Sequence, residues 1–201
     1  MAVDLIDRGT DNILELHPWY QENGRLRVEF SGSNCLLRMT EIPQNCTNVQ
    51  IRLGSRSTVI IGKRCRLSDT FMFLTEHCGL EIGSSTSFTA RARFILNEPS
   101  AIKIGEDCMI ASDVQFMTSD SHTIYDCTSG ERLNSAQDIE IGDHVWISLQ
   151  CLILKGTRVG SGSIIGARST VTGNIPGNCI AIGAPARVLR ENASWDRKLR
   201  K

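Results

Sequence analysis

The stretch that decides the fold is residues 141–176, which read IGDHVW ISLQCL ILKGTR VGSGSI IGARST VTGNIP. Six successive hexads each begin with isoleucine or valine, and nothing interrupts their register. Glycine is frequent at the second position, and the fifth position is small or β-branched. A period of six fits neither a helix, at 3.6 residues per turn, nor a lone strand, at two. It predicts a short strand and a sharp turn, repeated, with one aliphatic side chain per unit pointing inward.

A looser form of this repeat lies upstream. Four segments carry an aliphatic residue, any residue and then Ile-Gly, and they end at Gly62, Gly83, Gly105 and Gly142. The first two intervals, of 21 and 22 residues, are close to three hexads, as expected if three hexads close one triangular turn. The last interval, of 37 residues, contains an inserted segment, approximately residues 117–137. Because one unit cannot bury its apolar face alone, the units must stack into a solenoid.

Composition excludes several classes of protein. The 201 residues include 22 basic and 22 acidic side chains, so electrostatics give no reason to expect a nucleic-acid partner. A hydrophobic content of 41% is too high for a disordered chain. No apolar run approaches the roughly 20 residues that span a bilayer, and the N-terminus carries acids where a signal peptide needs a basic start. We therefore expect a cytoplasmic protein.

Eight cysteines would suggest disulfides in a secreted protein. Here no C-x-x-C pair occurs, so neither a zinc ribbon nor a dithiol redox site is indicated. Cys65, Cys108 and Cys151 each stand four residues after a hexad-leading isoleucine, at the small-residue position. We interpret the cysteines as free thiols that act as small buried hydrophobes in a reducing compartment.

The tandem hexads, followed by AIGAPARVLR at residues 181–190, resemble the hexapeptide-repeat O-acetyltransferases of the maltose, galactoside and capsule (polysialic acid) type. The resemblance covers approximately residues 50–190 and implies an all-β fold, a left-handed parallel β-helix with an inserted catalytic loop. It also implies a homotrimer whose active sites lie between subunits. Three regions follow: an N-terminal cap with degenerate coils (1–50), the β-helix acyltransferase domain (51–190) and a basic C-terminal tail (191–201).

The inserted segment carries the main candidate for chemistry. Its residues 119–132, SDSHTIYDCTSGER, resemble the S-D-x-H-x-I-Y-D loop of the family, and the catalytic histidine of the family maps onto His122. A neutral imidazole can remove the proton of a sugar hydroxyl as it attacks a thioester, and can then donate to the departing thiolate. Neither a metal nor an acyl-enzyme is needed, so direct transfer is expected. Asp120 is the candidate to orient the imidazole, and Tyr125 is a candidate to contact the acceptor.

Acetyl-CoA is the cosubstrate that the resemblance implies. The segment IGDHVWIS at residues 141–148 resembles the motif I-G-x-x-[VT]-W-I-G, in which the tryptophan lines the acetyl-CoA tunnel near the reacting centre. Trp146 is therefore both a catalytic and a cofactor-binding candidate, and Ser148 replaces the usual glycine. Basic side chains near the end of the solenoid suit the phosphates of the cofactor. The cofactor-binding candidates are Trp146, Ser148, Lys155, Ala167, Arg168, Arg187 and Arg190. The tail from Asp196 is either a further phosphate contact or solvated.

The acceptor site departs from the neutral-sugar members of the family. Where these carry an A-N-x-N segment, this chain has FTARARF at residues 88–94. Alternate residues of a strand face the same way, so Arg91 and Arg93 are expected side by side. Guanidinium groups bind carboxylates in a fork, which favours an acidic glycan such as capsular sialic acid. The alternative is two solvent-facing arginines.

Three other functions stay open. A metal enzyme on this fold, such as a γ-type carbonic anhydrase, needs three histidine ligands, two of them closely spaced, whereas His77 and His122 are 45 residues apart. A non-catalytic binding solenoid predicts uninterrupted coils with outward threonine ladders. N-acetylation of an amino sugar on the same scaffold is poorly discriminated by sequence, although the arginine pair and the capsule-like loop favour oxygen.

Overall fold

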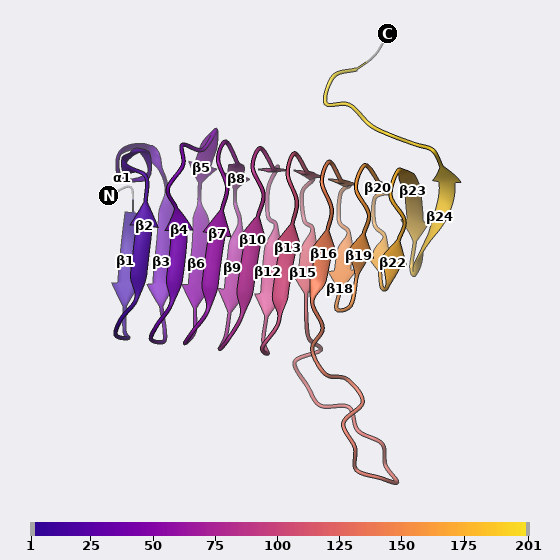
Figure 1. Ribbon diagram of the computed structural model, residues 1–201, viewed down its shortest axis with the longest axis horizontal. Helices are drawn as coiled ribbons and strands as arrows, with labels where there is room; N and C mark the ends of the chain where they lie inside the picture. The colour runs from indigo at the N-terminus through magenta and orange to yellow at the C-terminus, as the bar shows by residue number, and fades with distance from the viewer. Residues whose placement is uncertain (1–2, 200–201) are drawn as a thin grey trace.

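The computed structural model describes residues 3–199 as a three-sided solenoid. Three sheets form the sides, and the chain passes through them in turn, so that each coil stacks on the one before (Figure 1). Every strand pair is parallel except the last, β23 with β24, which is antiparallel. Within the described range each sheet has eight strands.

The sheets are named A, B and C in the order in which a coil meets them. Sheet A contains β1 (Val3–Asp7), β3 (Leu26–Phe30), β6 (Val49–Leu53), β9 (Phe71–Leu74), β12 (Arg93–Leu96), β15 (Gln115–Met117), β18 (Leu152–Leu154) and β21 (Thr170–Val171). Sheet B contains β2 (Ile13–Leu16), β4 (Leu36–Met39), β7 (Thr58–Ile61), β10 (Gly79–Ile82), β13 (Ala101–Ile104), β16 (Ile139–Ile141), β19 (Arg158–Val159) and β22 (Asn174–Ile175). Sheet C contains β5 (Asn45–Thr47), β8 (Arg66–Ser68), β11 (Ser87–Phe88), β14 (Met109–Ile110), β17 (Trp146–Ile147), β20 (Ile164–Ile165), β23 (Cys179–Gly183) and β24 (Ala186–Glu191).

The core is a column of inward side chains, as the hexads predict. All six hexad-leading residues are buried: Ile141, Ile147, Ile153, Val159, Ile165 and Val171. Aromatic rings stack along the column, and the centroids of Phe94 and Phe116 lie 4.7 Å apart. Every cysteine is a free thiol, and all are buried except Cys127, which is exposed in the inserted segment. The cysteines therefore pack as small hydrophobes, and Cys127 is the exception to that interpretation.

The glycine after each repeat isoleucine lets the next coil approach closely. A Cβ atom on Gly105 would lie 2.7 Å from the backbone nitrogen of Asp143, one coil further on. A Cβ on Gly142 would lie 2.7 Å from the backbone nitrogen of Ser161. These glycines are thus required by contact between coils, because their backbone lies against the backbone of the next corner.

Residues 1–50 are expected to form an N-terminal cap with degenerate coils, and the structure has coils there instead of an irregular cap. From Val3 onward its strands pair in parallel with the later coils, so the solenoid begins at β1, and residues 1–2 lie outside the described part. The hexad register is obscured because helix α1 (Pro18–Asn23) takes the place of a sheet C strand in the first coil. The Nδ1 of His17 accepts the Trp19 N–H at the helix start, and Tyr20 fills the core.

Two segments leave the stack. The inserted loop, here residues 118–138, projects from the corner between sheets A and B (Figure 1), where an insertion over 117–137 is predicted. The tail turns back after β24; of the predicted tail 191–201, residues 200–201 lie outside the described part. In residues 3–199 no helix is long and apolar enough to cross a membrane.

Replacing Gly105 by alanine tests the contact between coils. The added methyl group meets the carboxylate of Asp143 and also the backbone of Gly142 and Asp143, which cannot move aside as a side chain can. We therefore expect a loss of about 1–3 kcal/mol of unfolding free energy. Urea unfolding of both proteins measures it. Gly79→Ala is the matched control, since its Cβ would lie 3.6 Å from the Cβ of Ala101, an ordinary contact. Equal stability of the two variants would contradict the explanation.

Candidate active site

The inserted loop is tied at its base by the side chain of Asn134. This side chain is buried, with the residue 6% exposed. Its Nδ2 donates to the Oδ2 of Asp120 at 2.8 Å and to the carbonyl oxygen of His122 at 2.7 Å. Its Oδ1 accepts the backbone N–H of Ile124 at 2.8 Å. One amide therefore holds the backbone at and after the candidate histidine, and it binds the side chain of Asp120 before it.

Asp120 and Lys155 meet at the same base. The Nζ of Lys155 forms an ion pair with the carboxylate of Asp120 and donates to the carbonyl oxygen of Asn134 at 3.0 Å. Hydrogen bonds from Lys155 and Asn134 lower the pKa of Asp120 below its usual value. The carboxylate thus binds the side chains of Lys155 and Asn134 and links them at the loop base. That it orients the imidazole of His122 stays a prediction.

A second ion pair fastens the returning limb of the loop. Arg132 binds the carboxylate of Glu98 through Nη1 at 2.7 Å and Nη2 at 2.8 Å, and the hydroxyl of Ser119 donates to the same carboxylate. Hydrogen bonds from Arg132 and Ser119 lower the pKa of Glu98 to about 2. Gln137 closes the base by donating its N–H to the carbonyl oxygen of Thr118 at 3.0 Å.

Sequence reasoning missed three residues of this base, namely Glu98, Arg132 and Asn134. The coil register contains a signal for the first. Because Ile95 pairs with Met117 across β12 and β15, the corner that holds Glu98 stacks on the start of the loop, where the hydroxyl of Ser119 reaches Glu98. Asn134 and Arg132 lie in the irregular loop, where no repeat register predicts a contact.

In the isolated chain the candidate catalytic and acceptor-binding side chains of the loop face solvent. His122 is exposed, and Tyr125 is 59% exposed. The side chains of Ile124 and Leu133 are exposed as well. A bridge between Tyr125 and Arg132 joins the two limbs. The loop is thus a braced projection with an uncovered apolar surface around the candidate base.

All the candidate cofactor residues except Lys155 lie on sheet C or at the corner that follows it. Trp146 stands half-buried on the outer face of sheet C, where its strand pairs with Met109 and Ile164 of the neighbouring strands. Ser148 begins the next corner, between sheets C and A, and the corner with Ala167 and Arg168 stacks on it. The Arg168 N–H donates to the carbonyl oxygen of Leu149 at 2.8 Å.

The remaining basic candidates divide between two places. Arg187 and Arg190 are exposed on β24, opposite Ile182 and Ile180 of β23, so they border sheet C near its end. Lys155, however, lies at the loop base with Asp120, at the corner between sheets A and B. In a three-sided coil that corner is opposite sheet C. Within one chain, His122 and Lys155 therefore lie on the other side of the solenoid from Trp146.

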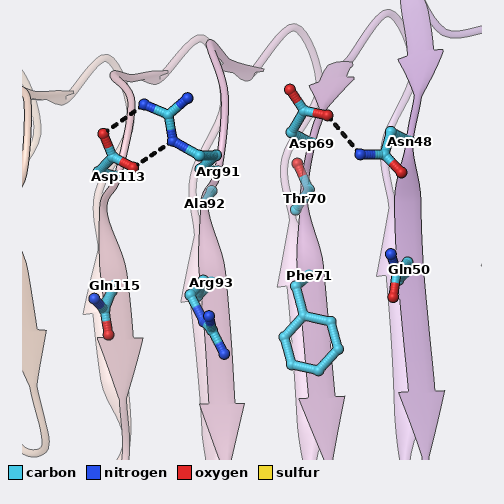
Figure 2. A pocket seen from close by; sticks show the side chains of 10 residues that line it. All are labelled: Asn48, Gln50, Asp69, Thr70, Phe71, Arg91, Ala92, Arg93, Asp113 and Gln115. Carbon is cyan, nitrogen blue, oxygen red and sulfur yellow. Dashed lines mark hydrogen bonds and ion pairs between the residues drawn. The ribbon is translucent and has the colours of Figure 1, made fainter.

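Arg91 and Arg93 line one depression on the outer face of sheet A, shown in Figure 2. They do not extend side by side as expected. Arg91 has a φ of 52° in the corner before β12, so strand alternation does not apply to it. Its guanidinium binds Asp113 in a fork, with Nε–Oδ1 at 2.6 Å and Nη2–Oδ2 at 2.8 Å. The guanidinium of Arg93 lies 5.3 Å from the ring centroid of Phe71.

Comparisons with known proteins agree with this architecture. No family model matches the chain. Among curated relatives, a polysialic acid O-acetyltransferase of Escherichia coli O1:K1 is 36% identical over 70% of this chain and 39% of its own length. A polysialic acid O-acetyltransferase of Neisseria meningitidis is 30% identical over 79% of this chain and 75% of its own length. The chain thus spans well under half of the first relative and three quarters of the second.

Solved structures extend the similarity to nearly the whole chain. The polysialic acid acetyltransferase NeuO has a TM-score of 0.88 at 30% identity, covering 98% of this chain and 90% of its own. The polysialic acid O-acetyltransferase OatWY has a TM-score of 0.89 at 26% identity, covering 98% and 92%. A hexapeptide-repeat acetyltransferase of Vibrio cholerae solved with acetyl coenzyme A has a TM-score of 0.53 at 25% identity, covering 66% and 70%.

The chain therefore belongs to the hexapeptide-repeat O-acetyltransferases, a family of enzymes that use acetyl-CoA as cosubstrate. Within that family the similarity includes polysialic acid O-acetyltransferases over 98% of the chain. The predicted resemblance and the predicted left-handed parallel β-helix are confirmed. In residues 3–199, no group of three or more His, Cys, Asp or Glu side chains is placed to hold a metal ion.

Replacing Asn134 by alanine tests the brace around His122. Without the Oδ1 acceptor, we expect the backbone amide of Ile124 to exchange with solvent faster than in the unchanged protein. Hydrogen exchange measured by mass spectrometry on loop peptides reports it. The amides of Thr128 and Ser129, which donate to Asp126, serve as the internal control. Unchanged exchange at Ile124 would show that Asn134 is dispensable to the loop.

The lowered pKa of Glu98 gives a stability that depends on pH. In the folded protein the pKa of Glu98 is about 2, below its ordinary value of 4.5. The stabilisation is therefore complete above about pH 4.5 and is lost as the pH falls toward 2. We expect Glu98→Gln to lower Tm at pH 7 and the difference from the unchanged protein to shrink between pH 4.5 and 2. A constant difference across that range would contradict the assignment.

Proposed function

We propose that the protein transfers the acetyl group of acetyl-CoA to a hydroxyl of an acidic capsular or surface polysaccharide of the sialic acid type, with His122 as general base. The observation that carries the proposal is the similarity to polysialic acid O-acetyltransferases over almost the whole chain. The inserted loop supports it as well, because its braced base exposes a histidine in the one long interruption of the described coils.

The chemistry is a single displacement. The imidazole of His122 takes the proton of the acceptor hydroxyl as the oxygen attacks the thioester carbonyl carbon. The C–O bond forms, the C–S bond breaks, and the imidazolium gives its proton to the departing thiolate. A backbone N–H would stabilise the intermediate oxyanion, a contribution of roughly 3–4 kcal/mol to the barrier. No covalent enzyme intermediate is required.

The brace at the loop base matters because catalysis depends on placement. Asn134 holds the carbonyl of His122 and the N–H of Ile124, and two ion pairs fasten the limbs. A base held in this way loses little entropy when the acceptor binds. In this proposal Asp120 and Lys155 hold the base of the loop. Arg168, Arg187 and Arg190 are then better candidates than Lys155 to bind the cofactor.

We further propose a homotrimer with active sites between subunits. The support is geometric, since His122 and Tyr125 lie opposite sheet C and its Trp146 in one chain. A second copy could bring its loop against that sheet. Six outer positions of sheet A are apolar and half-buried in the isolated chain: Phe71, Phe73, Ile95, Met117, Leu152 and Leu154. Sheet B carries surface ion pairs in the same middle and later coils, Glu81 with Lys103 and Glu140 with Arg158, which suits a face toward solvent, whereas the ion pairs between strands of sheet A lie in the first coils.

The cosubstrate is proposed to lie along sheet C near its end. Trp146 and Ser148 would contact the pantetheine arm beside Ala167, and Arg168, Arg187 and Arg190 would meet the phosphates. On the acceptor side, Arg93 has no carboxylate partner among the described residues, whereas Arg91 already holds Asp113. Of the two, Arg93 is therefore the better candidate to bind a sugar carboxylate. A cytoplasmic location fits both the cosubstrate and the eight free cysteines.

The experiment is an acetylation assay. The protein is incubated with acetyl-CoA and with polysialic acid or a neutral glycan, and thiol release is followed. We expect release with the acidic glycan only, and a loss of about 100- to 10,000-fold in His122→Ala. Thr123→Ala, on the adjacent exposed residue, is the control for loop substitution. Treatment of the product with hydroxylamine separates an O-acetyl ester, which is cleaved, from an N-acetyl amide, which is not.

Retained turnover in a folded His122→Ala protein would contradict the role of His122 as general base. No release with any glycan would remove the proposed function. Arg93→Ala should raise KM for the acidic acceptor with little change in kcat, and an unchanged KM would remove Arg93 from the acceptor site.

A further inference from the structure

The C-terminal strap, defined as residues 192–199, runs back along the corner between sheets B and C. After β24 the Ala193 N–H donates to the carbonyl oxygen of Asn178 at 2.8 Å. The indole Nε1 of Trp195 donates to the carbonyl oxygen of His144 at 2.8 Å, and Arg197 reaches Asp107. Asn178, His144 and Asp107 occupy equivalent corner positions, each with a left-handed φ. The strap thus crosses the later coils in reverse order (Figure 1).

A clamp around Asp107 anchors the strap. The carboxylate accepts from Arg197 through Nε at 3.1 Å and Nη2 at 3.0 Å, and it lies 2.8 Å from the Nδ1 of His144. Burial opposes ionisation of Asp107, but the hydrogen bonds from His144 and Arg197 outweigh it and lower its pKa. Arg197 also donates to the hydroxyl of Ser87 at 3.0 Å and to the carbonyl oxygen of Cys108 at 3.1 Å.

The clamp sets Trp195 beside Trp146. The ring of Trp195 stacks on the imidazole of His144, with centroids 4.2 Å apart and planes 7° from parallel. Its centroid lies 6.3 Å from that of Trp146, with planes tilted by 52°. Trp146 is half-buried on the outer face of sheet C. The strap therefore restricts the movement of the Trp146 indole toward the corner between sheets B and C.

The strap borders sheet C without covering it. Its hydrogen bonds go mainly to corner residues rather than to the strand residues that flank Trp146. A depression of about 470 Å³ stays open on sheet C beside the strap, lined by residues that include Arg66, Ser87, Met109 and Arg197. A wall of this kind shapes a binding site while leaving access to it.

We propose that Trp195 is a positioning residue of the acetyl-CoA site, which it serves by holding the indole of Trp146 in one orientation. The inference rests on the proposed function, in which Trp146 contacts the cosubstrate. A preorganised indole spares the ordering entropy that binding would otherwise cost. Loss of the strap should therefore weaken cosubstrate binding and leave the proton transfer at His122 unchanged, because the loop base shares no residue with the clamp.

The test compares full-length Trp195→Ala and Trp195→Phe with the unchanged protein. An aromatic contact of this kind is worth about 3- to 10-fold in binding. We expect Trp195→Ala to raise KM for acetyl-CoA, and Kd for coenzyme A by calorimetry, by that factor, with kcat within twofold. Trp195→Phe should recover most of the loss. Leu199→Ala, on a strap side chain that is 101% exposed, is the control and should match the unchanged protein.

Arg197→Ala supplies a second route if Trp195→Ala fails to fold, since it opens the clamp without altering an aromatic ring. It should raise KM in the same direction. An unchanged KM and Kd in folded variants would overturn the inference, and a lower KM or a higher kcat would show that the strap covers the site instead. If the unchanged protein binds coenzyme A but releases no thiol with any glycan, the proposed function fails. The Kd values for coenzyme A from calorimetry then still show whether Trp195 supports cosubstrate binding.

Discussion

Close stacking of one coil on the next is the constraint on which the structure depends. Each coil places apolar side chains inward from its three sides, most of them aliphatic, and the glycine after the repeat isoleucine allows the next backbone to approach. Since residues about one coil apart become neighbours, the stacking also positions the chemistry. It sets Glu98 against Ser119 at the start of the loop, and it aligns Asn178, His144 and Asp107 along one corner. The stacking of the coils thus brings these corner residues close to one another, and their side-chain contacts follow from that placement.

The places where stacking is interrupted carry the groups available for chemistry. The inserted loop abandons the repeat, and it is held instead by hydrogen bonds from Asn134, by two ion pairs between side chains and by the closing bond from Gln137 to Thr118. At the end of the stack, β24 turns antiparallel on β23 and blunts the open edge of sheet C. The strap then returns to the middle coils, where it meets His144 and Asp107. Both departures are thus held by residues of the regular coils.

Much of the fold follows from local pattern. Six uninterrupted hexads with small corner residues specify inward aliphatics and three-sided coils, because no other common structure has that period. By resemblance, the motif around His122 predicts the candidate base, and the motif around Trp146 predicts where the cosubstrate binds. The first fifty residues were harder to predict, since α1 replaces a strand there and shifts the spacing, although the inward alternation of β3 continues.

What the sequence by itself determined is the repeat, the position of its interruption and the identity of the candidate base. What only the tertiary structure decided is which side chains meet. Arg91 binds Asp113 because its corner backbone is left-handed, and Lys155 joins Asp120 because their corners stack. Trp195 reaches Trp146 because the tail folds back over 49 residues of chain. A periodic pattern specifies neighbours within the ladder, whereas contacts of loops and tails depend on chain direction, which no local pattern encodes.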